Sequence, residues 1–170
     1  MCQKDFLPYV YEELFYCFEK HMAVLAFKVS ANPNKSPQGC TSLTNYVFNR
    51  TFHTHSKSLV NYGSIEIQFD YNFEHPMFVP VADAHGLVEE DILEQVYPMF
   101  NIFMIHSFVG AEHQLIAKKH ITLIHQRSKN PLIFLILYDE SKRDSSFTTS
   151  QDGNIVKIMI SRYSDLLAIS

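Results

Sequence analysis

The sequence has few glycines and cysteines, and these shortages exclude several classes of protein. Five glycines occur in 170 residues, and none belongs to a GxGxxG, GxxxxGKS/T or GxSxG pattern. Dinucleotide-binding, P-loop and serine-hydrolase sites therefore lack the backbone that they require, and no cofactor is expected. The three cysteines, Cys2, Cys17 and Cys40, are odd in number and show no CxxC spacing, which argues against a secreted disulfide scaffold.

Long apolar runs and an excess of positive charge are missing as well. The apolar stretch from Leu132 to Leu137 falls far short of the roughly 20 residues needed to span a bilayer. The first residues lack the apolar segment and cleavage site of a signal peptide. A formal net charge of −4 and a pI near 6.1 give no electrostatic reason to bind nucleic acids or anionic membranes. We expect a cytoplasmic protein without nucleic-acid or membrane partners.

The chain does contain enough apolar material for a sizeable core. Apolar residues make up 46% of it and charged residues 19%, with fourteen phenylalanines and nine tyrosines. This balance excludes a disordered chain. Because the length lies just above the usual size of one domain, we predict a single α+β domain over residues 1–170.

Helical periodicity is clearest near the N-terminus. Apolar residues recur at three- and four-residue spacing from about 5 to 21, which predicts an amphipathic helix. Acidic residues precede a second apolar pattern, and we expect a helical region over 89–107 with a kink at Pro98. Residues 41–60 allow a helix or a strand, and we favour a helix. Residues 111–125 begin like a helix but become rich in β-branched residues, so both states stay open there.

The strand signals differ from one segment to the next. Residues 64–71 alternate apolar and polar, which indicates a half-exposed antiparallel strand, and 132–138 are continuously apolar, as in a central strand. Segments 22–30 and 154–161 predict further strands, and the polar run 139–153 predicts a mobile hairpin loop. We therefore expect an antiparallel sheet of four to five strands with helices packed mainly on one face.

Nine histidines are the most unusual feature of the composition. On a strand, His53 and His55 would lie on the same face and could offer two metal ligands. A third ligand would have to come from elsewhere in the fold: His75, Asp83, His85, His106, Glu112 or His113. No second spaced pair supports such a site, so no metal is favoured.

One histidine lies in a pattern that resembles a known catalytic motif. His120-Ile121-Thr122-Leu123 is similar to one of the two His-x-Thr-x motifs of the 2H phosphoesterase family, in which each motif lies on a strand. The resemblance implies that His120 acts as the acid or base and that Thr122 contacts phosphate, without a metal. Because the second motif is absent, His53 or His55 would have to supply the opposite acid or base.

Two further catalytic arrangements have weaker support in the sequence. Arg50 and His55 match the spacing of the RNA-cleaving motif of HEPN domains, but that fold is all-helical and the expected strands contradict it. Cys40 follows a predicted loop, and His53 or His55 could act as its base. A Cys-His hydrolase usually has a characteristic sequence motif around its cysteine, and this sequence lacks one.

These observations favour a non-enzymatic binding domain, either a ligand-responsive regulatory module or a protein-protein adaptor or inhibitor. The alternative is the 2H-like phosphoesterase or ribonuclease. The binding hypothesis predicts a protein partner or a homo-oligomer, and a small ligand is compatible with it. Aromatic and methionine side chains are typical interface anchors, and we expect the contact surface to include Tyr97, Phe100, Phe103 and Met104.

Overall fold

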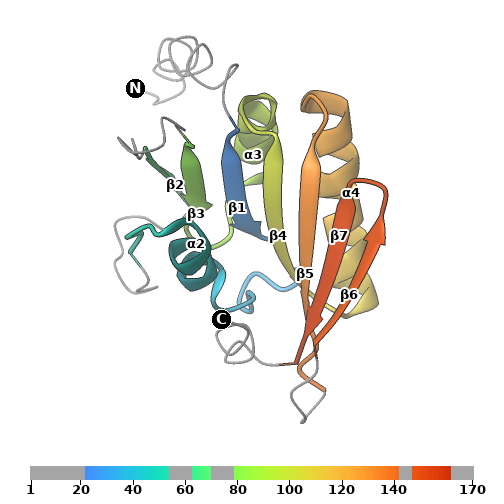
Figure 1. Cartoon of the computed structure of the whole chain (residues 1–170). Coiled ribbons are helices and arrows are strands. Elements are labelled where there is room, and N and C mark those ends of the chain that lie inside the picture. The colour runs from blue at the N-terminus through green and yellow to red at the C-terminus, as the bar shows by residue number, and fades with distance from the viewer. Residues whose placement is uncertain (1–21, 54–62, 70–78, 142–146, 162–170) are drawn as a thin grey trace.

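The computed structural model describes residues 22–53, 63–69, 79–141 and 147–161, and these build one seven-stranded sheet with helices on both faces (Figure 1). Within these ranges no helix combines the length and the apolarity that crossing a bilayer demands. The N-terminal helix expected at 5–21 lies outside the described residues.

The strand order is β2-β3-β1-β4-β5-β7-β6. The five inner strands β3, β1, β4, β5 and β7 run parallel, and the edge strands β2 and β6 are antiparallel to their neighbours. The strands are β1 Val24–Lys28, β2 Ile65–Gln68, β3 Val81–Ala84, β4 Ile102–Phe108, β5 Leu132–Tyr138, β6 Phe147–Asp152 and β7 Ile155–Ile160.

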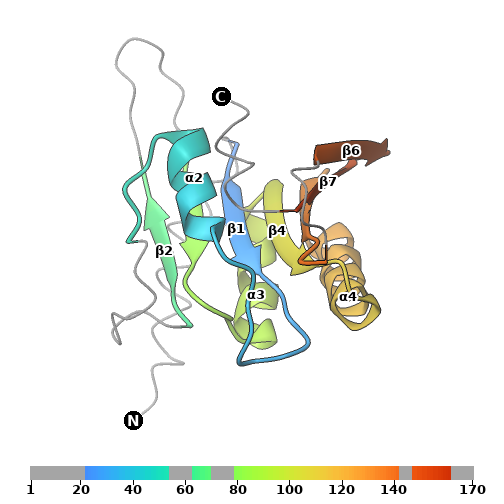
Figure 2. The same ribbon diagram turned by 90° about the horizontal axis from the view of Figure 1, so that it is seen from below.

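Helices cover both faces of this sheet. The helix α2, Cys40–Phe48, packs on one face, and α3 (Glu90–Val96), the 3₁₀ turn η2 (Tyr97–Met99) and α4 (Ala111–Arg127) pack on the other (Figure 2). Successive residues of a strand point to opposite faces. Accordingly, alternate residues of the parallel strands enter two separate cores, one under α2 and one under α3 and α4.

The chain connections make the fold doubly wound. From β1 the chain passes over the α2 face to β3, and from β4 it passes over the α4 face to β5 on the opposite side of β1. The connections leaving β1 and β4 therefore diverge where these two strands end. In open sheets of this kind, ligands bind outside the carboxyl ends of the strands at such a reversal.

The prediction of an antiparallel sheet of four to five strands with helices mainly on one face is wrong. The alternation at 64–71 correctly indicated a half-buried antiparallel strand, since β2 is an edge strand whose Ile65 and Ile67 pack against the core. That alternation indicates an edge strand and does not predict the direction of the inner strands. Parallel inner strands are covered on both faces and show no alternation.

Two strands lie where the sequence predicted other structure. β4 falls in the expected helix 89–107, of which only α3 and η2 are helical, and β3 falls in a stretch that we assigned to no element. Both are short, buried apolar runs, and periodicity cannot distinguish such a run from a buried helix segment.

The structure assigns part or all of each of the remaining segments, 41–60, 111–125 and 139–153, to a helix or a strand. Of residues 41–60 the structure describes 41–53, which are helical as far as Phe48, and 111–125 are helical throughout as part of α4. Within 139–153, expected to be a loop, the strand β6 occupies Phe147–Asp152 and pairs with β7. A two-residue turn at Gly153 and Asn154 joins these strands.

Candidate functional site

Polar side chains gather on the α2 face at the carboxyl ends of the parallel strands. Strand alternation directs Lys28 of β1, Asp83 of β3, His106 of β4 and Tyr138 of β5 to this face. Asp83 and His106 are completely buried. Buried polar groups are costly unless they are paired, so this set, termed the edge cluster below, is the strongest candidate for a site.

Asp83 is held by the start of α2 and by the residue that follows β3. Its carboxylate accepts a hydrogen bond from Thr41 Oγ1 at 2.7 Å and contacts the Cys40 thiol at 3.7 Å. His85 Nδ1 lies 3.5 Å from the same carboxylate, and His85 Nε2 lies 2.9 Å from Glu66 on β2. Burial raises the pKa of Asp83, and these partners oppose that shift.

Cys40 is a buried thiol in this arrangement. Burial, followed by the charge of Asp83, raises the pKa of Cys40 well above its ordinary value. A helix N-terminus normally stabilises a thiolate, but here a carboxylate lies against the sulfur. The thiol therefore stays protonated near neutral pH and is a poor nucleophile. His53, proposed as its base, is exposed in the segment after α2.

His106 is satisfied on one side of its ring only. Its Nδ1 lies 2.8 Å from the Tyr138 hydroxyl, and the two rings stack with centroids 5.8 Å apart. The Nε2 atom is buried and has no hydrogen-bond partner among the described residues. Burial, with a smaller effect of Lys28, lowers the pKa of His106 to about 3, so the ring is neutral.

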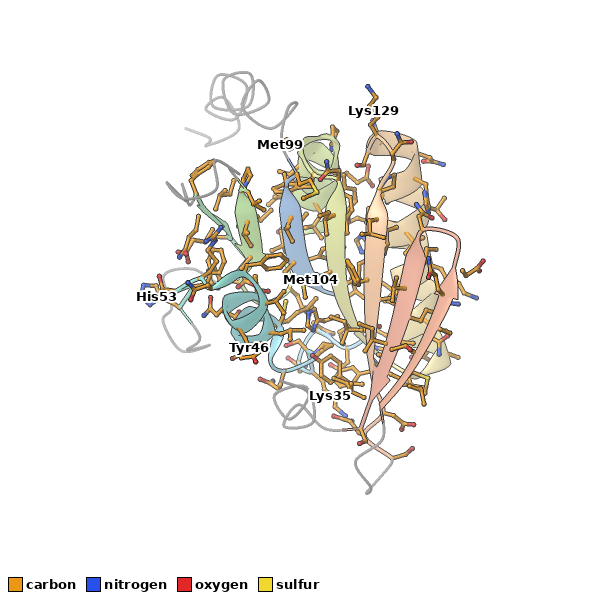
Figure 3. The ribbon with its side chains drawn as sticks, viewed as in Figure 1. Lys35, Tyr46, His53, Met99, Met104 and Lys129 are labelled. Carbon is orange, nitrogen blue, oxygen red and sulfur yellow. The ribbon has the colours of Figure 1, made fainter. Side chains whose placement is uncertain are left out.

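The loop 29–39 between β1 and α2 covers the carboxyl ends of β4 and β5. Its Ala31 amide donates to His113 Nδ1 at 3.0 Å near the start of α4. Its Lys35 forms an ion pair with Glu140, which follows β5, and lies 5.1 Å from the Phe108 ring centroid (Figure 3). Val29 is buried and its amide donates to the His106 carbonyl at 2.9 Å, whereas from Ala31 onward these few, mostly exposed contacts connect loop 29–39 to α4 and to the end of β5.

The structure does not bring His120 and Thr122 together. Both lie on α4, where residues two positions apart point to different sides of the helix. His120 is buried and its Nδ1 lies 2.6 Å from the Tyr97 hydroxyl, whereas Thr122 is exposed and donates to the Lys118 carbonyl. The strand on which the 2H resemblance depends is therefore absent from this segment.

The expected contact surface lies in the interior. Tyr97, Phe100, Phe103 and Met104 are each at most 5% exposed and belong to the two cores. Tyr97 and Phe103 pack edge to face with centroids 5.7 Å apart. These residues build the fold, and they offer no surface to a partner. A protein partner or a homo-oligomer stays a prediction.

The described residues do not assemble the proposed metal ligands into a site. His53 lies at the β2 side of α2 (Figure 3), and His55 lies outside the described residues. No group of three or more potential ligands is positioned to hold a metal within the described part of the chain. Arg50, the partner of His55 in the HEPN spacing, donates to the Val79 carbonyl at 3.1 Å.

The edge cluster contains residues that sequence reasoning overlooked. Asp83 and His106 were considered only as third metal ligands, and Lys28 and Tyr138 were not considered. The available signal was a single polar residue inside or ending an apolar run: AVLAFK, VADA and IFMIH. Such a residue points to a site only once the strands are known to be parallel neighbours.

Comparison with known proteins adds no family to this description. No family model matches the sequence, and no curated protein is similar to it at a significant level.

Proposed function

We propose that this protein is a non-enzymatic, ligand-responsive binding domain that takes a small polar ligand at the carboxyl edge of its parallel sheet. One observation carries the proposal: the reversal between β1 and β4 coincides with the edge cluster. Doubly wound sheets bind ligands at this place because the diverging connections leave a crevice there.

The chemistry of the cluster supports binding over catalysis. Cys40 is a protonated thiol held against a carboxylate, and His106 is a neutral ring with a very low pKa. An effective general base at neutral pH has a pKa near 7. Neither group is suited to catalysis by this criterion, whereas both can form hydrogen bonds to a ligand.

The loop 29–39 supports a response to the ligand. Its ties to His113 and Glu140 are a single hydrogen bond and an exposed ion pair, and an exposed pair contributes about 0–1 kcal/mol. A ligand that binds at this edge can therefore replace these contacts at small cost. Displacement of the loop would alter the surface over β4 and β5, which is how binding could be signalled.

The test is a binding screen on the full chain. Purified protein is heated with nucleotides, carboxylic acids, amino acids, sugars and polyamines, and compounds that raise the melting temperature are confirmed by calorimetry. For each binder, hydrogen exchange of the Ala31 and Lys35 amides is compared with and without ligand. We expect a binder that changes exchange in loop 29–39. Failure of every chemical class to bind, or binding that leaves this loop and the edge cluster unaffected, would falsify the proposal.

A further inference from the structure

We infer that the ligand of this site carries an anionic oxygen group, a carboxylate or a phosphate, bound between the Lys28 ammonium and the His106 Nε2–H. The inference rests on the proposed function and assigns a chemical class to its ligand. It follows from two neighbouring groups that lack a partner among the described residues, one a buried donor and the other a cation.

The buried donor is defined by the Tyr138 hydroxyl. A phenol O–H is a better donor than acceptor, and a neutral imidazole nitrogen is a good acceptor, so Tyr138 donates to Nδ1 across 2.8 Å. The single proton of the neutral ring then resides on Nε2. That N–H is buried and unpaired within the described part of the chain, although a buried donor without an acceptor carries a substantial penalty.

The orientation of the ring directs this donor toward Lys28. The two nitrogens of an imidazole point to nearly opposite sides of the ring, so Nε2 points away from Tyr138 and β5. The strand on that other side of β4 is β1, where Lys28 is in register with His106. The charge of Lys28 also contributes to the low pKa of His106, which agrees with their proximity.

Lys28 supplies the positive charge. Its side chain is partly buried, and its ammonium has no hydrogen bond or ion pair to any other described residue. The neighbouring anion is Asp83, whose carboxylate is already engaged by Thr41, Cys40 and His85. Because the Asp83 carboxylate is bonded to the first residues of α2, the Lys28 ammonium and the His106 Nε2–H are left to bind a ligand.

An oxyanion fits these two groups better than a neutral ligand does. Carboxylates and phosphates present at least two acceptor oxygens, one for the ammonium and one for the ring N–H, and charge-assisted hydrogen bonds are about twice as strong as neutral ones. A hydroxyl group would satisfy the ring N–H and leave the lysine ammonium without an anion bonded to it. A cationic ligand would be repelled.

The test uses phosphate and succinate as anionic probes, and glycerol and choline as neutral and cationic ones. Binding to the full chain is measured by calorimetry and by the ¹⁵N resonance of His106 Nε2. We expect an anion to shift this resonance. The probe with the higher affinity, phosphate or succinate, shows whether the site prefers a phosphate or a carboxylate. Lys28→Met and His106→Leu should each weaken binding by about tenfold or more. His106→Gln, which keeps an N–H donor, should retain part of the affinity.

Lys129→Met is the matched control, because Lys129 lies at the opposite end of the sheet (Figure 3). It should bind the anion like the wild type. The inference is overturned if neither anion perturbs His106 in the wild-type protein, or if Lys28→Met binds as tightly as Lys129→Met. A glycerol or choline site at the same edge would refute the anionic ligand and leave the proposed binding function standing. The wild-type resonance decides the question even if a variant does not fold.

Discussion

At the scale of single residues, the interior contains polar side chains that are satisfied in different ways. Tyr97 and His120 form a closed pair in the core under α3 and α4. His106 shares one nitrogen with Tyr138 and leaves the other unpaired, and Asp83 is surrounded by donors. A closed pair contributes to stability, whereas the partly satisfied residues mark the candidate site.

Replacing Tyr97 with phenylalanine should destabilise the protein by about 1–3 kcal/mol, since His120 Nδ1 would lose its donor in a buried environment. Tyr46→Phe is the matched control, because Tyr46 is 53% exposed on α2 and its change should stay within about 0.5 kcal/mol. Urea unfolding measures both free energies. Equal effects would show that the hydroxyl of Tyr97 has no special role.

Between about pH 4 and 6.5, His106 and Asp83 should affect stability with opposite signs. The pKa of His106 is lowered to about 3, so on acidification the unfolded chain binds a proton that the folded chain does not, and stability falls. The pKa of Asp83 is raised, so the folded chain binds the extra proton and stability falls as the pH rises.

The difference is measured by urea unfolding across this pH range. His106→Gln should make the free energy of unfolding rise less steeply with pH, and Asp83→Asn should make it rise more steeply. Each contribution is limited to about 1.4 kcal/mol per pH unit. Variants that change the slope in the same direction would contradict the burial of one of these groups.

At the scale of elements, the sequence pattern matches the observed helix or strand where one side of the segment is exposed. α4 buries Ala117, His120 and Ile124, whose spacing is that of a helix face. The β-branched residues near His120 suggested a strand only when considered apart from this spacing. The hairpin of β6 and β7 likewise has a signal in the sequence, because Gly-Asn between two strand-like runs is typical of a two-residue hairpin turn.

Gly153 provides the clearest test of an element. It lies at the first position of the two-residue turn with φ of 58°, and a Cβ there would meet no atom within 4 Å. Gly153→Ala should therefore cost about 1–2 kcal/mol through backbone strain alone, and Gly153→Asn should cost less because asparagine tolerates positive φ. Thermal unfolding compares the three proteins. An alanine variant as stable as the wild type would contradict this turn.

At the scale of the whole molecule, the fold places the edge cluster by bringing together strands that are far apart in the sequence. Lys28 and His106 lie side by side although 77 intervening residues separate them, since β1 pairs with both β3 and β4. The same arrangement makes β1, β4 and β5 interior strands with hydrogen bonds on both sides.

Hydrogen exchange should reveal this order of strands. Amides of β1, β4 and β5 are expected to exchange slowest, through global unfolding, while the outward amides of β6 exchange much faster because that edge is open among the described residues. NMR of the full chain in deuterated buffer provides the measurement. Fast exchange throughout β1, comparable to β6, would show that β1 does not lie between β3 and β4.

The sequence by itself determined the local features of this protein. The edge strand β2, the buried strand β5 and the strands near 22–30 and 154–161 follow from alternation and apolar runs, because those patterns depend on the immediate surroundings of each residue. β3 and β4 did not follow, since a short run buried on both faces has no distinctive period.

Only the tertiary structure decided the sheet order, the parallel direction of the inner strands and the edge cluster. Register and direction depend on pairing between distant segments, and no local pattern encodes them. Lys28, Asp83 and His106 look like isolated polar residues in three apolar runs until β3, β1 and β4 lie side by side. His120 and Thr122 are close in the sequence but separated in the structure. On a strand both would lie on one face, whereas on the helix α4 they point to different sides.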